Sequence, residues 1–499
     1  MALPEYSFRA AQASAVAASD KALRITDRAG SIWRRAASKP AHAARLRSLD
    51  RFLPDGLASS ADGGWWELEP GVQIVTPAMF GCGPSVADNA PGLSDFYAYL
   101  ERFGCAASHD GLYPVRSQVV MGTGAAEAGP GGSDRALILG RLTLDVTAPI
   151  AGAVVTSRMK RSARIEGMAI GGGGGSLAYA DKLFDIGLLV EGSARRQTIG
   201  HLEVGHARLF GVFLRGRGAG SAAFGHAFGT ARIHGCGSGC ADSGSRPAPA
   251  GAFLRADYSM IVPGGASGAF YQTSTFQLKP GSALPPPAIE AYGLPSFVRV
   301  GGEEFPVVFY DRSANRVTVW GWAPPGTAST DGSIDFVFGG GWASAGGDSG
   351  TRVGHLALTA NAIGHQNGAL HPAAVAATMK HNYIGQTVGS SPTGASVGGA
   401  TFGRFEGNNA DIWFLASPES KDVDYRVVAD RAPGPARVRF HSGRRSDGSK
   451  VHSGSPRGLT LSYRRGTAAL PSGPEWSATG TSARPSNGAE REARRSQPI

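Results

Sequence analysis

Short apolar runs that end in glycine recur along the chain. Residues 187–192 read GLLVEG and residues 211–216 read GVFLRG, while a second run, IGHLEV at residues 199–204, returns as VGHLAL at residues 353–358. The first two runs are short apolar strands closed by glycine, and in the second pair apolar and other residues alternate over a few positions, which is the period of a strand rather than of a helix. The pattern predicts many short strands with glycine at the corners between them.

The repetition also predicts how the strands are arranged. A repeat of roughly 20 to 30 residues is too small to bury its own apolar face, so successive repeats must stack into one continuous core. We therefore predict an all-β protein whose main body is a right-handed parallel β-helix. A leucine-rich repeat would need a fixed spacing of Leu and Asn, which the chain lacks. A β-sandwich remains the alternative, because it too is built from short alternating strands.

One segment, residues 93–103, has helical periodicity instead. Its apolar residues fall three and four positions apart, on one face of a helix. They are Leu93, Phe96, Tyr97, Leu100 and Phe103. The first coil of a stacked fold exposes unpaired backbone at its open end and needs a cover. We expect one α-helix here that caps the β-helix.

Changes in composition divide the chain into five parts. An Ala-rich stretch from Ala10 to Ala22 predicts a helix near the start. Residues 298–342 alternate at period two, which predicts a small antiparallel β insertion. The last segment has hardly any apolar residues, so we expect disorder there. The predicted parts are residues 1–70 (N-terminal region), 71–257 (first coils), 258–350 (β insertion), 351–463 (further coils) and 464–499 (basic tail).

Charge and hydropathy exclude several classes of protein. Hydrophobic residues make up 42% of the 499 residues, which is enough to form a core. The net charge is +10, but the segment from Arg431 onward holds 13 Lys and Arg against 4 Asp and Glu, so about +9 lies in the tail. No apolar run reaches the roughly 18 residues of a membrane span, and the start lacks the features of a signal peptide. We expect no nucleic-acid partner, no membrane insertion and no Sec export.

The segment around the predicted helix contains a characteristic order of motifs. Gly-Gly-Trp-Trp at residues 63–66 is followed by VTPAMFGCG at residues 75–83, by the pair Asp88-Asn89, by the helix and by GLYPV at residues 111–115. This order resembles the N-terminal module of pectate-lyase-like proteins and of phage tailspikes. The resemblance supports the predicted β-helix and its capping helix.

The same resemblance implies a function. It implies a receptor-binding spike that binds a bacterial cell-surface polysaccharide, capsule or lipopolysaccharide. Such a protein is exposed on the surface of a phage or a gene-transfer-agent-like particle and is made in the bacterial cytoplasm. The resemblance further implies a homotrimer that joins other virion structural proteins through residues 1–70.

Two other functions remain open. One is a tailspike depolymerase, a glycoside hydrolase or polysaccharide lyase that cleaves the same polysaccharide. The other is a secreted pectate-lyase-like enzyme, which the missing signal peptide disfavours. Cys82 stands where the family usually has alanine, and Asn89 stands where a second aspartate is usual. These departures argue against close membership of one enzyme subfamily.

Carboxylates on neighbouring coils are the catalytic candidates of the depolymerase. Glycoside hydrolysis normally uses two carboxyl groups about 5 to 9.5 Å apart, and equivalent positions on adjacent strands lie about 4.8 Å apart. The four candidates are Asp181, Asp185, Glu191 and Glu203. The alternative for each is a surface acid that is solvated or paired with arginine.

Arginines and aromatic residues are the candidates for carbohydrate binding. Arg215 and Arg217 flank Gly216, and guanidinium groups pair well with the carboxylate of an acidic sugar. Aromatic rings of the insertion could stack on sugar rings or could form the insertion's own core; they are Tyr310, Trp320, Trp322 and Trp342. We expect the site on the lateral surface of coils 180–240, with the insertion as its wall.

We expect no cofactor and no metal. Cys236 and Cys240 lie beside His234, but a zinc site usually needs a second pair of ligands, which is not evident. The four cysteines are too few for a disulfide scaffold. GDSG at residues 347–350 resembles the nucleophile loop of trypsin-like proteases, but no matching histidine motif accompanies it. The histidines that recur in coil register indicate a turn or a surface ladder; they are His201, His206, His226 and His234.

Overall fold

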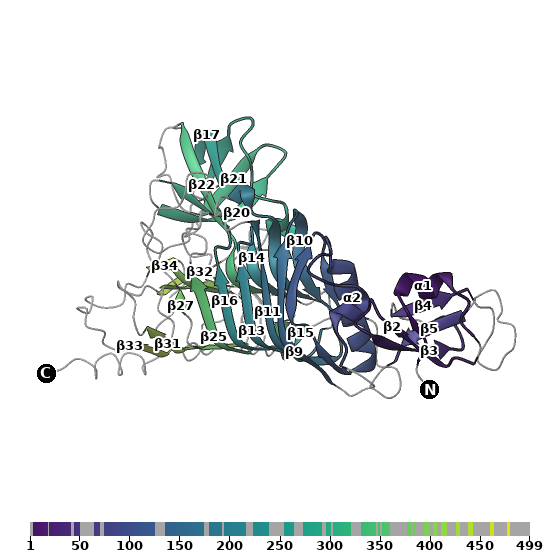
Figure 1. The fold of residues 1–499 in the computed structure, drawn as a ribbon. Coiled ribbons are helices and arrows are strands. Elements are labelled where there is room, and N and C mark those ends of the chain that lie inside the picture. Colours follow the sequence, from purple (N-terminus) through teal and green to yellow (C-terminus); the bar gives the residue numbers. More distant parts are fainter. Residues whose placement is uncertain are drawn as a thin grey trace.

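The computed structural model shows a mainly β protein with few helices (Figure 1). The described residues are 3–17, 19–40, 44–49, 64–69, 74–124, 135–173, 179–191, 194–215, 223–238, 254–263, 273–291, 296–300, 303–320, 331–345, 348–349 and 352–359, together with short strands between residues 377 and 479.

Two sheets of parallel strands are stacked along the body of the molecule, and the chain passes alternately from one to the other. The large sheet contains β6 (Ala106–Ser108), β7 (Gly111–Val115), β9 (Arg135–Val146), β11 (Ser162–Gly172), β13 (Gln197–Gly205), β16 (Ala227–His234), β25 (Arg352–Thr359), β26 (Ala377–Lys380), β27 (Tyr383–Ile384) and β29 (Gly403–Glu406). The small sheet contains β8 (Val119–Met121), β10 (Ile150–Ser157), β12 (Phe184–Glu191), β14 (Phe210–Arg215) and β23 (Gly340–Ala345). The stacked parallel strands predicted from the repeats are therefore present.

Equivalent apolar residues of successive coils stack on one another between the two sheets. In the large sheet, Ile165 pairs in register with Ile138 on one side and Ile199 on the other. In the small sheet, one column of paired residues runs through Val155, Leu188, Val212 and Trp342, and each of them is at most 1% exposed. Because each coil contributes only a few such side chains, the core exists only when the coils are stacked.

A closed antiparallel barrel interrupts the coils between β16 and β23. Its strands are β17 (Leu254–Pro263), β18 (Thr273–Leu278), β19 (Ser296–Val300), β20 (Glu303–Asp311), β21 (Arg316–Trp320) and β22 (Gly332–Phe338), with the short helix α3 (Ala288–Ala291). In Figure 1 the barrel stands to one side of the stacked strands. Its apolar side chains form one cluster with those of the small sheet, including Phe210 and Phe213. The barrel therefore covers the outer face of the small sheet.

The barrel ends earlier than the sequence pattern indicates. The chain leaves the barrel at Phe338 and returns at once to the small sheet, where Trp342 pairs with Val212. Residues 339–341 form the turn and the first part of β23. Trp342 therefore belongs to a coil, and its predicted place in the insertion is wrong.

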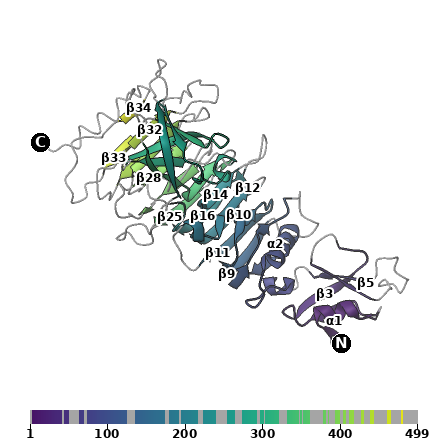
Figure 2. The ribbon, with the colours of Figure 1, turned by 90° about the horizontal axis from the view of Figure 1, so that it is seen from above.

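The N-terminal region forms its own sheet beside the body (Figure 2). Its elements are β1 (Glu5–Tyr6), α1 (Phe8–Ala13), β2 (Ala22–Ile25), β3 (Ser31–Ala36), β4 (Arg45–Ser48) and β5 (Gly64–Leu68). The helix predicted from Ala10 to Ala22 is wrong after Ala13. Leu23 and Ile25 alternate with exposed positions and are fully buried in this sheet, so tertiary packing overrides the helix propensity of the alanines that precede them.

The predicted capping helix is confirmed as α2 (Ala90–Phe103), which follows the 3₁₀ turn η1 (Pro77–Phe80). Its apolar face is buried against the first coil. Glu101 joins the helix to the next coils, because its carboxylate accepts hydrogen bonds from the backbone N–H groups of Thr123 at 2.6 Å and Lys160 at 2.8 Å. His109 makes a second link: its Nδ1 lies 3.0 Å from the Tyr97 hydroxyl and its Nε2 lies 3.2 Å from the carbonyl of Gly140.

Parallel pairing continues towards the C-terminus. One sheet contains β28 (Thr393–Gly398), β30 (Asp411–Ala416), β32 (Val438–Ser442) and β34 (Ser477–Thr479), and another contains β31 (Arg426–Ala429) and β33 (Thr460–Tyr463). A further parallel pair joins β15 (Ala223–Phe224) and β24 (Asp348–Ser349). Strand β34 lies inside the segment that composition predicts to be disordered, and it pairs with β32.

Candidate functional site

The outward face of the large sheet is the surface on which polar side chains gather. The barrel covers the small sheet on its outer side, whereas strands of the large sheet alternate between buried and more exposed positions. In β13 the inward residues Leu202 and Val204 are buried, while His201 and Glu203 point outward. A period of two along each strand and an in-register stack across strands together make columns of outward residues.

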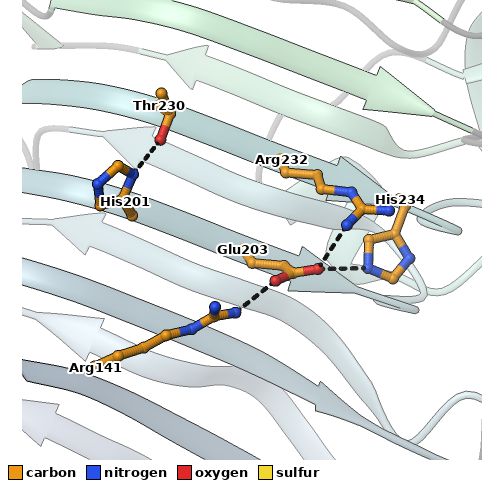
Figure 3. Close-up of polar contacts among 6 residues, drawn as sticks. All are labelled: Arg141, His201, Glu203, Thr230, Arg232 and His234. Carbon is orange, nitrogen blue, oxygen red and sulfur yellow. Dashed lines mark hydrogen bonds and ion pairs between the residues drawn. The ribbon is translucent and has the colours of Figure 1, made fainter. Parts of the chain in front are cut away.

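Three such columns meet in the middle of the sheet. The pairing of β9, β11, β13 and β16 places Arg141, Gly167, His201 and Thr230 in the first column. The second contains Thr143, Ala169, Glu203 and Arg232. Beyond it, Asp145 pairs with Gly171 and Gly205 pairs with His234, one strand position past the last pair of β11 and β13, and these residues extend a third column. Arg141, His201, Glu203, Thr230, Arg232 and His234, the Glu203 cluster, therefore come from three strands and lie on one face (Figure 3).

Glu203 is the centre of this cluster. Its Oε2 accepts a hydrogen bond of 2.6 Å from Nη2 of Arg141, and its Oε1 lies 3.4 Å from Nη1 of Arg232 and 3.7 Å from Nε2 of His234 (Figure 3). The side chains of Arg141 and Arg232 are 57% and 66% exposed, and that of Glu203 is 31% exposed. One carboxylate therefore holds two largely exposed guanidinium groups at defined places on the surface.

Glycine makes this arrangement possible at two positions. Arg141 on β9 reaches Glu203 on β13 across the intervening strand β11, where Gly167 stands in register with Arg141. A Cβ atom at Gly167 would lie 3.4 Å from Cγ of Arg141, which is van der Waals contact, so a side chain longer than a methyl group there would compete with the arginine for space. A Cβ atom at Gly205 would lie 2.5 Å from the ring of His234, so glycine lets that ring lie over the strand.

Histidine and threonine extend the polar surface beside Glu203. Nδ1 of His201 lies 2.7 Å from the hydroxyl of Thr230, and both residues are exposed (Figure 3). The rings of His234 and His206 meet edge to face with their centres 5.1 Å apart. The face therefore offers guanidinium, imidazole, hydroxyl and carboxylate groups in adjacent columns, which is a set that can bind the hydroxyl and acidic groups of a glycan.

The four predicted catalytic carboxylates do not form one cluster. Asp181 is exposed in the short turn η3 (Tyr179–Asp181). Asp185 pairs with Nε of Arg208 at 2.8 Å and accepts a hydrogen bond from the N–H of Gly152. Glu191 is buried and pairs with Arg158 at 2.7 Å.

Their positions along the strands keep them apart. Asp185 and Glu191 lie near opposite ends of β12, and a rise of about 3.3 Å per residue separates them by about 20 Å. Glu203 lies on β13, in the other sheet. Because arginine occupies three of the four carboxylates, these three fit the alternative of an arginine-paired acid better than that of a proton donor.

Two of the predicted aromatic residues are not available to a sugar. Tyr310 is 8% exposed, and its hydroxyl donates a 2.7 Å hydrogen bond to Oγ of Ser296 inside the barrel. Trp342 is fully buried and packs edge to face on Phe228 in the core of the coils. Stacking on a ligand needs an exposed ring, so the prediction of carbohydrate binding by these two residues is corrected: both serve as core.

The remaining candidates are placed only in part. Arg215 is the last residue of β14, in register with Glu191, and Trp320 is the last residue of β21. Their side chains, and the whole of Arg217 and Trp322, lie outside the described residues.

Sequence reasoning missed Arg141, Thr230 and Arg232. The sequence did contain a signal for them. When the coils are aligned on the repeated Gly-His pair, the alternation along each strand shows which residues of every coil face outward. His201 stands two residues before Glu203, just as Thr230 stands two residues before Arg232. The contact between Arg141 and Glu203 joins residues 62 positions apart, and it crosses the strand between them at Gly167.

The described residues contain no group of three or more His, Cys, Asp or Glu that could hold a metal ion. Cys82 and Cys236 are buried, and Cys240 lies outside the described part of the chain. Burial raises the pKa of Cys82 to about 12, which keeps the thiol protonated and unreactive near neutral pH. No helix in the described ranges is long and apolar enough to cross a membrane.

Comparison with known proteins gives no family for this chain. A scan against protein-family models, a search of curated proteins and a search of solved structures each find no match.

Proposed function

We propose that this protein is a receptor-binding spike that binds a bacterial cell-surface polysaccharide, capsule or lipopolysaccharide, on the outward face of the large sheet. The proposal includes the finer fold, a right-handed parallel β-helix of the pectate-lyase-like type. The observation that carries it is the in-register array of outward polar residues centred on Glu203, on the face that the barrel leaves open.

A long, shallow face suits a polymer. Columns of outward residues repeat about every 4.8 Å from strand to strand, so several sugar residues of one chain can contact equivalent positions at the same time. Arginine, histidine and threonine donate hydrogen bonds to hydroxyl and ring oxygens, and Glu203 accepts them. Many weak contacts in a row give a polymer higher affinity than a single sugar.

Binding without cleavage is the function that we favour over depolymerisation. Hydrolysis of a glycosidic bond requires a carboxylic acid that can donate a proton and a second carboxylate at a defined distance. Asp185, Glu191 and Glu203 each form an ion pair with arginine, and these contacts occupy carboxylate oxygens that a proton donor would have to present to the substrate. The separation of Asp185 from Glu191 along β12 also exceeds what either hydrolytic geometry needs.

The N-terminal region supports the attachment part of the proposal. Residues 1–70 would join the particle and leave the large sheet exposed on its surface, in a homotrimer of parallel chains. The five-stranded N-terminal sheet lies beside α2, at the end of the body opposite the C-terminal strands (Figure 1). Attachment at that end would direct the rest of the spike away from the particle.

The proposal is tested by incubating the purified protein with a panel of bacterial capsular polysaccharides and lipopolysaccharides of known sugar composition. Binding is measured by sedimentation or surface plasmon resonance, and polymer length is measured by size-exclusion chromatography. We expect at least one polymer to bind with unchanged length. Shortening of the polymer would favour the depolymerase, and failure of every polymer to bind would reject the proposed function.

A further inference from the structure

We infer that the polysaccharide bound by this face is acidic, and that its carboxylate groups bind to Arg141 and Arg232. The inference rests on the proposed function and names the chemical class of its ligand. Its basis is the arrangement of the two guanidinium groups around Glu203, which sequence reasoning did not predict.

Both arginines retain hydrogen-bond donors for a ligand. A guanidinium group has five N–H donors, whereas the described contacts with Glu203 use one nitrogen of each arginine, Nη2 of Arg141 and Nη1 of Arg232. The two side chains are more than half exposed, so the other donors face solvent. Guanidinium and carboxylate groups match in geometry and can form two parallel hydrogen bonds.

The positive charge of this face is local to the two guanidinium groups, which with Glu203 carry a net charge of +1. Two other acidic side chains, Glu166 and Asp110, lie near Arg141, so the anion is expected to contact the guanidinium groups themselves. Glu166 accepts a hydrogen bond of 2.8 Å from Gly140, and Asp110 accepts one of 3.1 Å from Arg141 itself.

Glu203 acts as a positioning residue. A free arginine side chain on a surface samples many rotamers, and fixing it on binding costs conformational entropy. Because the carboxylate already holds Arg141 at 2.6 Å, part of that ordering is complete before the ligand arrives. The same carboxylate repels an incoming anion. Removing its charge would therefore loosen the arginines, which weakens binding, and would also remove a repulsion of the ligand, which strengthens it.

Space for a sugar ring lies beside the arginines. Strand β11 contributes Gly167, Ala169 and Gly171 to the outward face, and none of them has a side chain longer than a methyl group. No atom lies within 4 Å of where a Cβ of Gly171 would stand. A pyranose ring could lie over the Gly171 end of β11 while its carboxylate contacts the arginines, because the side chain of Arg141 already occupies the space over Gly167.

The test uses the full chain and the same panel of polysaccharides, half of them uronate- or sialate-bearing and half neutral. Each polymer that binds is also carboxyl-reduced, which replaces the carboxylate by a hydroxymethyl group. Arg141→Ala, Arg232→Ala and the double variant that carries both substitutions are compared with Arg255→Ala, a matched control on the barrel that is 67% exposed and pairs with Asp335 at 2.8 Å. Circular dichroism melts verify that each variant is folded.

We expect binding to acidic polymers only, a loss of at least about tenfold in affinity on carboxyl reduction, and about tenfold for each arginine variant. The control variant should bind like the wild type. Binding of a neutral polymer, or of the acidic polymer by the double variant at wild-type affinity, overturns this inference but leaves the proposed function intact. If no polymer binds, the proposed function itself fails.

Glu203→Gln supplies the readout for positioning. It removes a negative charge that opposes the ligand, yet we expect affinity for the acidic polymer to fall several-fold because the arginines lose their ionic partner. A rise in affinity would show that Glu203 only repels the ligand, and would overturn its positioning role.

Discussion

The two parallel sheets are built from the same coils but differ in what covers them. Strand β12 of the small sheet is buried at nearly every position, because core side chains pack on one side and the barrel on the other. Strand β13 of the large sheet alternates, with His201 and Glu203 outward between buried residues. A sheet covered on both faces has no surface left for a ligand, whereas the half-covered sheet can keep a stable core and a polar face at the same time.

If the proposed function is correct, this difference places stability mainly in the small sheet and recognition on the large sheet. Substitutions in the small sheet should change folding, and substitutions on the outward face of the large sheet should change binding with little effect on folding. The predictions below test that separation, starting from the largest expected effect.

Removing the barrel should expose the small sheet and cause association. The N–H of Ser238 donates a 2.9 Å hydrogen bond to the carbonyl of Phe338, so a short Gly-Ser linker can replace residues 239–338. The deletion uncovers Phe210, Phe213 and their neighbours, which form a contiguous apolar patch. We expect assemblies larger than those of the wild type in sedimentation velocity. A deletion variant that keeps the wild-type sedimentation profile would contradict the role of the barrel as a cover.

Trp342→Ala should destabilise the fold by about 3 to 5 kcal/mol, because it leaves a cavity at the end of a buried column. The matched variant is Thr230→Ala on the outward face, with an expected change below about 1 kcal/mol. Urea unfolding followed by tryptophan fluorescence and circular dichroism measures both. Equal effects of the two substitutions would remove the distinction between the sheets.

Acid should weaken the link between α2 and the coils. Burial lowers the pKa of His109 to about 4, against about 6.5 in an unfolded chain. The unfolded state therefore binds more protons between these values, so stability is complete above pH 6.5 and declines as pH falls to 4, by about 3 kcal/mol for this residue.

His109→Gln should reduce that pH dependence, although it also lowers stability at neutral pH through altered contacts with Tyr97 and Gly140. Urea unfolding at pH 7, 5.5 and 4 gives, for each protein, the slope of the free energy of unfolding against pH. An identical slope in wild type and variant would mean that His109 does not contribute to acid sensitivity.

Gly167→Val should change stability least and still affect binding. The added side chain meets Cγ of Arg141 and displaces it from Glu203. We expect a cost below about 1 kcal/mol, since β-branched residues suit strands, together with roughly tenfold weaker polysaccharide binding. Thermal melting measures the change in stability, and the binding assay measures the change in affinity for the polysaccharide. Unchanged binding would show that the path of Arg141 across β11 is unimportant.

The stacked parallel strands and α2 could be predicted from the sequence, because both depend on local periodicity. Leu93, Phe96 and Leu100 follow a helical period, and the GLLV and GVFL runs of the small sheet are nearly continuous because that sheet is covered on both faces. Patterns within ten or so residues carry this information directly.

The candidate site could not be predicted in the same way. It depends on which residues of separate coils come into register, and one residue of shift would turn every side chain to the opposite face. The burial of Trp342 could not be predicted for the same reason. It depends on pairing with Val212, and the whole barrel lies between these two residues in the sequence. The ion pair between Arg141 and Glu203 also crosses the strand between them, where the small residue Gly167 leaves room for the arginine side chain.

The most direct test of the account is to block one face at a time and measure polysaccharide binding. Thr230→Trp places a large ring on the outward face of the large sheet, and Met260→Trp places one on the barrel, where Met260 is 37% exposed. The account predicts that Thr230→Trp abolishes binding while Met260→Trp binds like the wild type, with both variants folded. Binding that survives Thr230→Trp and is lost in Met260→Trp would contradict it.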